Sequence, residues 1–64
     1  MIGHRIKSLR NARRLYAFEL ADRAGLARSV VSKVETGKTK PEQSTINKLA
    51  QELGVTVAEL ERTE

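Results

Sequence analysis

The sequence predicts an all-α fold, a compact five-helix bundle. Apolar residues recur through most of the chain at the three- and four-residue spacing of one helix face. Gly25, Gly37 and Gly54 each directly follow such a pattern, at the position where helices commonly end. The sequence contains no run of alternating apolar and polar residues of the kind that marks a β-strand. Because the connections are all short, we expect residues 1–64 to form a single domain.

The first two helices are expected at residues 3–13 and 17–24. The apolar residues that define the first helix are Ile2, Ile6 and Leu9. The apolar stripe of the second helix consists of Leu20, Ala21 and Ala24. Gly25 then reverses the chain, since a left-handed backbone conformation costs little only for glycine.

The last three helices are expected at residues 28–36, in a segment that ends before Gly54, and from Thr56 onward. Val31 and Val34 anchor the third helix. The fourth helix has apolar residues at Ile46, Leu49, Ala50 and Leu53. Thr56 and Glu59 have the spacing of a capping box and open the fifth helix, which carries Val57 and Leu60. The expected core is aliphatic and consists of Ile6, Leu9, Leu15, Leu20, Ala24, Leu26, Val31, Val34, Ile46, Leu49, Leu53, Val55 and Leu60.

Composition narrows the class of protein. The chain has 64 residues, near the lower limit for a domain that folds without covalent or metal support. It has no cysteine, so disulfides and thiolate metal sites are excluded. No apolar run could span a membrane, and charged residues follow Met1 and Ile2 too closely for a signal peptide. We therefore expect a cytoplasmic protein with no membrane contact.

Charge is divided unevenly along the chain. Residues 1–40 contain ten Lys or Arg and three Asp or Glu, a net charge of +7. Residues 41–64 contain two Lys or Arg and five Asp or Glu, a net charge of −3. One side of the domain is therefore expected to attract a polyanion and the other to repel it. A solvated surface with a chance asymmetry is the alternative explanation.

The third helix is expected to present a polar and cationic face outward. A short helix of this kind, braced by another helix, fits the major groove of DNA. Arg28 can donate two hydrogen bonds to guanine O6 and N7, and Lys33 can reach the same acceptors or a phosphate. Val30 either packs in the core or contacts a thymine methyl group. The predicted base-reading residues are Arg28, Ser29, Val30, Ser32 and Lys33.

Further cationic residues flank this face and are candidates for phosphate contacts. The loop at residues 37–40 offers backbone N–H groups and two lysines. Two arginines stand at the end of the first helix. The predicted phosphate-contacting residues in these segments are Lys38, Thr39, Lys40, Arg13 and Arg14.

Residues over nearly the whole chain match one family pattern with its spacing kept: Leu15, Leu20, Ala21, Ala24, Gly25, Leu26, Val31, Ser32, Val34, Glu35, Gly37, Lys38, Pro41, Leu49, Ala50, Leu53, Gly54, Val55 and Leu60. In this pattern the chain resembles the lambdoid phage repressor and Cro (XRE-like) type of helix-turn-helix. The resemblance implies five helices, of which the second and third form the helix-turn-helix. It also implies a transcriptional regulator, of the repressor kind, that binds as a homodimer to double-stranded operator DNA with two symmetric half-sites.

The resemblance also assigns roles to individual residues. It implies a partly buried ion pair between Arg10 and Glu35, a role that we favour over a phosphate contact by Arg10. It implies that the dimer contact lies near the fifth helix, at Val55, Val57 and Leu60. It implies a phosphate contact at the start of the second helix, where this chain has Tyr16 and Ala17.

The start of the second helix departs from the family pattern. Members usually have Ser, Thr or Asn followed by Gln, so that the first side chain caps the helix and the amide contacts the DNA backbone. Tyr16 cannot cap the helix in this way, and Ala17 leaves backbone N–H groups for the phosphate, with the Tyr16 hydroxyl as another candidate. Ala27 similarly replaces the usual Ser or Thr cap of the third helix, which typically costs about 0.5–2 kcal/mol.

Tyr16 and Phe18, the only aromatic residues of the chain, give this corner an apolar surface. The corner either makes altered DNA contacts or binds a protein partner. The second hypothesis is therefore a protein-interaction module, such as an antitoxin or an accessory subunit, built on the same fold. We expect no enzyme, cofactor or metal site, because His4 is isolated, Glu35 lacks a second carboxylate or base, and no metal-ligand spacing occurs.

Overall fold

The computed structural model describes residues 2–61, which form five α-helices and no strand. The helices are α1 (Ile2–Ala12), α2 (Ala17–Ala24), α3 (Arg28–Glu35), α4 (Gln43–Leu53) and α5 (Val57–Glu61). The all-α prediction and the order of the five helices are therefore confirmed, with helix ends within a residue or two of those expected. Among the described residues, no helix has the length and apolar character needed to cross a bilayer.

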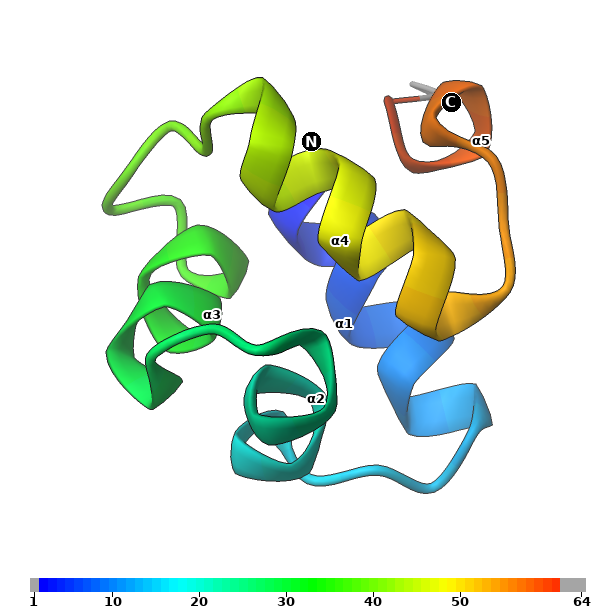
Figure 1. The fold of residues 1–64 in the computed structure, drawn as a ribbon, viewed down its shortest axis with the longest axis horizontal. Coiled ribbons are helices and arrows are strands. Elements are labelled where there is room, and N and C mark those ends of the chain that lie inside the picture. The colour runs from blue at the N-terminus through cyan, green and yellow to red at the C-terminus, as the bar shows by residue number, and fades with distance from the viewer. Residues whose placement is uncertain (1, 62–64) are drawn as a thin grey trace.

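The helices are arranged so that α2 and α3 project from a scaffold made by the others. Figure 1 shows α4 crossing in front of α1, with α2 and α3 together on one side. Helix α3 packs against α1 and α2, whereas α5 packs only against α1 and α4. Helix α5 therefore lies at the opposite end of the molecule from the helix-turn-helix pair, as Figure 1 also shows.

The core is aliphatic, as the sequence predicts, and every helix contributes to it. Its buried side chains are Ile6, Leu20, Ala21, Val31, Val34, Ile46, Leu49, Ala50, Leu53 and Leu60. Four other expected core residues are only partly buried and pack against this cluster: Leu9, Ala24, Leu26 and Val55. Leu15 is also only half-buried, because it lies in the extended turn between α1 and α2 at the edge of the bundle. The prediction that Leu15 belongs to the core is therefore corrected.

The three glycines end helices as predicted. Gly25, Gly37 and Gly54 have φ angles of 71°, 77° and 72°, in the left-handed region. In each case the following backbone N–H donates to a carbonyl five residues back: Leu26 to Ala21, Lys38 to Lys33, and Val55 to Ala50. This arrangement is the Schellman motif, which satisfies carbonyl groups at a helix end.

A fourth such turn, at the end of α1, has no glycine. Arg14 takes the left-handed conformation there with a φ of 56°, and the Leu15 N–H donates to the Arg10 carbonyl at 3.2 Å. A residue with a Cβ pays roughly 1–2 kcal/mol for this conformation. The sequence pattern could not reveal this turn, because its usual signal is a glycine.

The helix starts differ in how well they are capped. The predicted capping box of α5 forms, with the Thr56 N–H donating to Glu59 Oε1 at 3.2 Å and the Glu59 N–H donating to Thr56 Oγ1 at 3.1 Å. Ala27 gives α3 no side-chain cap, as expected. At the start of α2, the Tyr16 N–H donates to Glu19 Oε1 at 2.9 Å, which supplies the glutamate half of a capping box.

Gly3 has a packing role that the sequence analysis does not predict. It is buried inside α1, and a Cβ atom built on it would collide with the Val34 carbonyl oxygen of α3. The same atom would lie 3.1 Å from the Glu35 Cα. Only glycine therefore lets the start of α1 approach the backbone at the end of α3 this closely.

We predict that Gly3→Ala lowers the free energy of unfolding by about 1–3 kcal/mol, because the added methyl group forces two backbones apart. Urea denaturation followed by circular dichroism measures this change. His4→Ala is the matched control, since His4 is the next residue of α1 and is exposed. Similar stability for the two variants would contradict the proposed close approach.

Candidate nucleic-acid interface

Helix α3 has one buried face and one exposed polar face. Val31 and Val34 are buried in the core. The exposed residues of the helix are Arg28, Ser29, Ser32 and Lys33, which are four of the five predicted base-reading residues. Val30 is half-buried and packs against the core, so part of its side chain serves as core and the rest stays accessible. The structure thus gathers these side chains on one outward surface.

An ion pair fixes the C-terminal end of α3. Arg10 Nε lies 2.7 Å from Glu35 Oε2, and Arg10 Nη2 donates to Glu35 Oε1 at 3.0 Å. The remaining terminal nitrogen of Arg10 donates to the Leu15 carbonyl at 2.7 Å. The two side chains are only 11% and 7% exposed. This is the pair that the resemblance implies, and it ties α3 to α1 and to the turn before α2.

The charge state of Arg10 follows from this pairing. The hydrogen bond to Glu35 raises the pKa of Arg10, and the nearby negative charge adds to this, whereas partial burial acts in the opposite direction. Arg10 therefore remains a cation and stays paired with Glu35. All three guanidinium nitrogens of Arg10 donate to acceptors inside the fold, which supports a structural role over a phosphate contact.

The start of α3 is held by contacts that the sequence analysis does not predict. Arg28 donates from Nε to Asp22 Oδ1 at 3.3 Å and from Nη2 to Asp22 Oδ2 at 3.0 Å. The Arg28 Cζ atom lies 5.0 Å from the centre of the Phe18 ring, within range of a cation–π contact. Hydrogen bonding to Asp22 raises the pKa of Arg28. In the sequence, the only indication of these contacts is the four-residue spacing of Phe18 and Asp22, which puts both residues on one face of α2.

Tyr16 extends this cluster. Its ring stacks on that of Phe18, with the ring centres 5.6 Å apart and an angle of 7° between the planes. Tyr16 is 69% exposed and Phe18 is 45% exposed. The apolar corner expected from the sequence is thus a stacked group, and its Phe18 member also contacts Arg28 on the exposed face of α3.

The loop after α3 offers fewer backbone donors than expected. The Gly37 N–H donates to the Val34 carbonyl at 3.2 Å, and the Lys38 N–H donates to the Lys33 carbonyl at 2.9 Å. Both groups are used to end α3, so the prediction that they are available to phosphate is wrong. The side chains of Lys38, Thr39 and Lys40 are exposed, as a phosphate contact requires.

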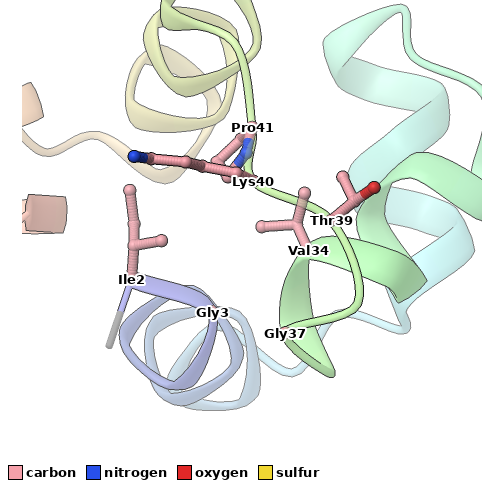
Figure 2. A pocket seen from close by; sticks show the side chains of 7 residues that line it. All are labelled: Ile2, Gly3, Val34, Gly37, Thr39, Lys40 and Pro41. Carbon is pink, nitrogen blue, oxygen red and sulfur yellow. The ribbon is translucent and has the colours of Figure 1, made fainter.

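A shallow groove lies beside this loop. Figure 2 shows Ile2, Val34, Thr39 and Lys40 around it, between the start of α1 and the α3–α4 loop. Its volume is about 230 Å³, below the roughly 300–1,000 Å³ typical of small-molecule sites. The groove is therefore too small to indicate a small-molecule ligand.

Two further predicted phosphate sites flank the surface. Arg13 and Arg14 are exposed at the end of α1, although one Arg13 nitrogen, Nη1, donates to the Leu9 carbonyl at 3.2 Å. At the start of α2, Ala17 is half-buried, and the Glu19 carboxylate already occupies the neighbouring N–H of Tyr16. This negative charge opposes a phosphate at Ala17.

The predicted dimer residues are not equally accessible. Leu60 has no exposed surface, because it lies on the face of α5 that packs into the core. Its prediction as a dimer contact is therefore corrected, since its side chain is fully used within the chain. Val55 and Val57 pack against the core but are only half-buried. These two valines remain candidates for a contact between protomers.

Residues 2–61 contain no group of three His, Cys, Asp or Glu side chains placed to hold a metal ion. His4 is exposed on α1, and Glu35 is committed to Arg10. The arrangement of the described residues is therefore one of a binding surface: an exposed helix face with cations around it.

Comparison with known proteins supports this interpretation. A helix-turn-helix family model matches residues 6–60. The immunity repressor protein of Bacillus phage phi105 is 37% identical over 57 residues, which cover 89% of this chain and 40% of that protein. The chain thus spans less than half the length of this curated relative.

Two solved structures are similar to this chain in both sequence and fold. The restriction-modification controller protein C.AhdI from Aeromonas hydrophila is 39% identical, with a TM-score of 0.89 over 92% of this chain and 89% of that one. SinR, a master regulator for biofilm formation whose structure was determined in complex with DNA, is 36% identical, with a TM-score of 0.91 over 97% of this chain and 100% of that one. These similarities confirm the five-helix fold that the sequence predicts.

We predict that Glu35→Gln lowers the free energy of unfolding by about 3 kcal/mol, because the charge of Arg10 is then left without its carboxylate in a partly buried site. Chemical denaturation measures the loss. Asp22→Asn is the control, because it breaks an exposed Arg–carboxylate pair worth at most about 1 kcal/mol. An equal loss in the two variants would mean that burial of the Arg10–Glu35 pair has no structural importance.

Proposed function

Because the chain belongs to the helix-turn-helix family, we propose that it is a sequence-specific, double-stranded DNA-binding transcriptional regulator of the repressor kind. The observation that carries this proposal is the exposed face of α3, which is anchored at its C-terminal end by the Arg10–Glu35 pair and flanked by cationic side chains. The named relatives agree with it: one is a phage repressor, one is a controller protein, and one was solved with DNA. A cytoplasmic location and the absence of catalysis belong to the same proposal.

In this proposal α3 enters the major groove with its first turn toward the bases. Arg28 takes guanine O6 and N7, while Ser29, Ser32 and Lys33 contact base edges or the nearby backbone. The accessible part of Val30 is suited to a thymine methyl group. Phosphate contacts come from Arg13, Arg14, Lys38, Thr39, Lys40 and the hydroxyl of Tyr16, which together fix the register of the helix on the duplex.

The proposed active form is a homodimer on a two-fold symmetric operator. Helix α5 lies away from α2 and α3, so a contact through Val55 and Val57 leaves both reading helices free. Residues 41–64 have a net charge of −3, which keeps that end away from the phosphates. Two symmetric reading helices would then address half-sites about 34–36 Å apart, one turn of the duplex.

The protein-interaction hypothesis depends on the stacked corner. Tyr16 is largely exposed, which leaves it available to another protein. Phe18 contacts both Tyr16 and Arg28, so its ring is already used within the chain. The geometry therefore favours the DNA-binding proposal for this corner, and the partner hypothesis remains the alternative.

Selection of bound duplexes from a random library tests the main proposal. We expect an enriched, two-fold symmetric sequence bound at least about 10³-fold more tightly than random duplex. The logarithm of the affinity should fall with the logarithm of the salt concentration, with a slope of about 0.9 per phosphate contacted. No enrichment, with every duplex bound in the same weak range, would support the protein-interaction alternative instead.

Arg28→Ala and Lys38→Ala separate base reading from phosphate contact. Arg28→Ala is expected to cost about 1–3 kcal/mol at one base pair and to relax the preference there. Lys38→Ala should weaken binding to all sequences alike. It should also reduce the slope of log affinity against log salt concentration by about 0.9, the value for one phosphate contact. Binding titrations with the selected duplex and single-base variants measure both effects. A uniform loss for Arg28→Ala would exclude it as a base reader.

A further inference from the structure

Arg28 stands at the first position of α3, but the residues that fix its direction are on α2. Asp22 accepts two hydrogen bonds from the guanidinium, and the Phe18 ring lies under it. We propose that Asp22 and Phe18 are specificity-determining positioning residues, which hold Arg28 so that it reads one base pair. This inference rests on the proposed DNA-binding function and assigns a role to two residues outside the reading helix.

The hydrogen-bond geometry leaves Arg28 able to read a base. Its guanidinium carries five N–H donors. Asp22 uses one on Nε and one on Nη2, along the side edge of the group. Three donors remain, and two of them, one on Nη1 and one on Nη2, lie side by side on the end edge. Guanine O6 and N7 need two donors side by side, and the end edge supplies them while the Asp22 contact is kept.

The exposure of the Arg28–Asp22 pair indicates that it contributes little to the stability of the fold. The Arg28 and Asp22 side chains are 67% and 51% exposed, and exposed ion pairs add little to stability. An arginine loses much rotational freedom when a ligand fixes it, so a side chain already held in place loses less on binding. The benefit of Asp22 and Phe18 therefore appears when DNA binds, and chiefly when the base matches the held direction.

The negative charge of Asp22 affects general affinity for DNA and discrimination between sequences in opposite directions. A carboxylate at the DNA-facing surface repels the phosphate backbone of every duplex, regardless of sequence. Its orientation of Arg28 benefits only the sequence with the matching base. Asp22 should therefore reduce general affinity while raising discrimination. A residue with a merely structural role would change both together.

The experiment measures Kd for the selected duplex, for random duplex, and for the duplex altered at the base pair that Arg28→Ala identifies. Asp22→Asn should reduce discrimination at that base pair about 3- to 10-fold, with affinity for random duplex equal or higher. Phe18→Leu, which keeps an apolar side chain but removes the ring face, should reduce it about 2- to 5-fold. Discrimination at other base pairs should not change.

Two controls make the result specific. In the Arg28→Ala background, neither Asp22→Asn nor Phe18→Leu should reduce discrimination further, since there is no guanidinium left to position. Glu52→Gln removes an exposed carboxylate from α4 and should leave discrimination unchanged. Thermal melts establish that all variants remain folded.

Several results would overturn the inference. Greater discrimination in Asp22→Asn would show that Asp22 competes with DNA for Arg28. An effect that persists in the Arg28→Ala background would show that Asp22 or Phe18 acts by another route. Unchanged discrimination in a protein that does select a site would refute the positioning role alone, whereas a wild-type protein that selects no site would refute the proposed function as well.

Discussion

The ion pair between Arg10 and Glu35 is the constraint on which the position of α3 depends. It joins the last turn of α1 to the last residue of α3, and through the Leu15 carbonyl it also holds the turn that leads into α2. In the first turn of α1, Gly3 lets that helix touch the backbone at Val34 and Glu35. Both contacts act on the same end of α3. The C-terminal end of the helix is therefore fixed from the side that faces the rest of the domain.

The opposite end of α3 is held more loosely. Ala27 provides no side-chain cap, and the Arg28 contacts with Asp22 and Phe18 are largely exposed. A firmly held C-terminal end and a solvent-accessible first turn suit a helix whose first turn must meet a ligand. The missing cap costs stability, and the buried aliphatic residues under Val31 and Val34 offset that cost.

The sequence was sufficient for the features that depend on local pattern. Apolar spacing located all five helices, glycines marked three helix ends, and Thr56 with Glu59 marked the start of α5. It was insufficient where a residue's role depends on what approaches it in space. Gly3 resembles any helical glycine until α3 lies against it, Arg14 has no glycine signal, and Leu60 fits both the core and a surface until the burial of α5 is known. Asp22 likewise becomes part of the candidate site only because α3 begins beside it.

The two Arg–carboxylate pairs show how burial gives the same chemistry different roles. Arg10 and Glu35 are 11% and 7% exposed, so separating them leaves a charge that water solvates poorly, and the pair behaves as a fixed link. Arg28 and Asp22 are 67% and 51% exposed, so water compensates either partner and the pair contributes little to the stability of the fold. A fixed link is suited to holding a helix, whereas an exposed pair is suited to directing a side chain that must still accept another partner. Because the fixed pair anchors α3, the direction in which Asp22 holds Arg28 is also defined relative to the rest of the domain. Under the proposed function, specific recognition therefore depends on both pairs.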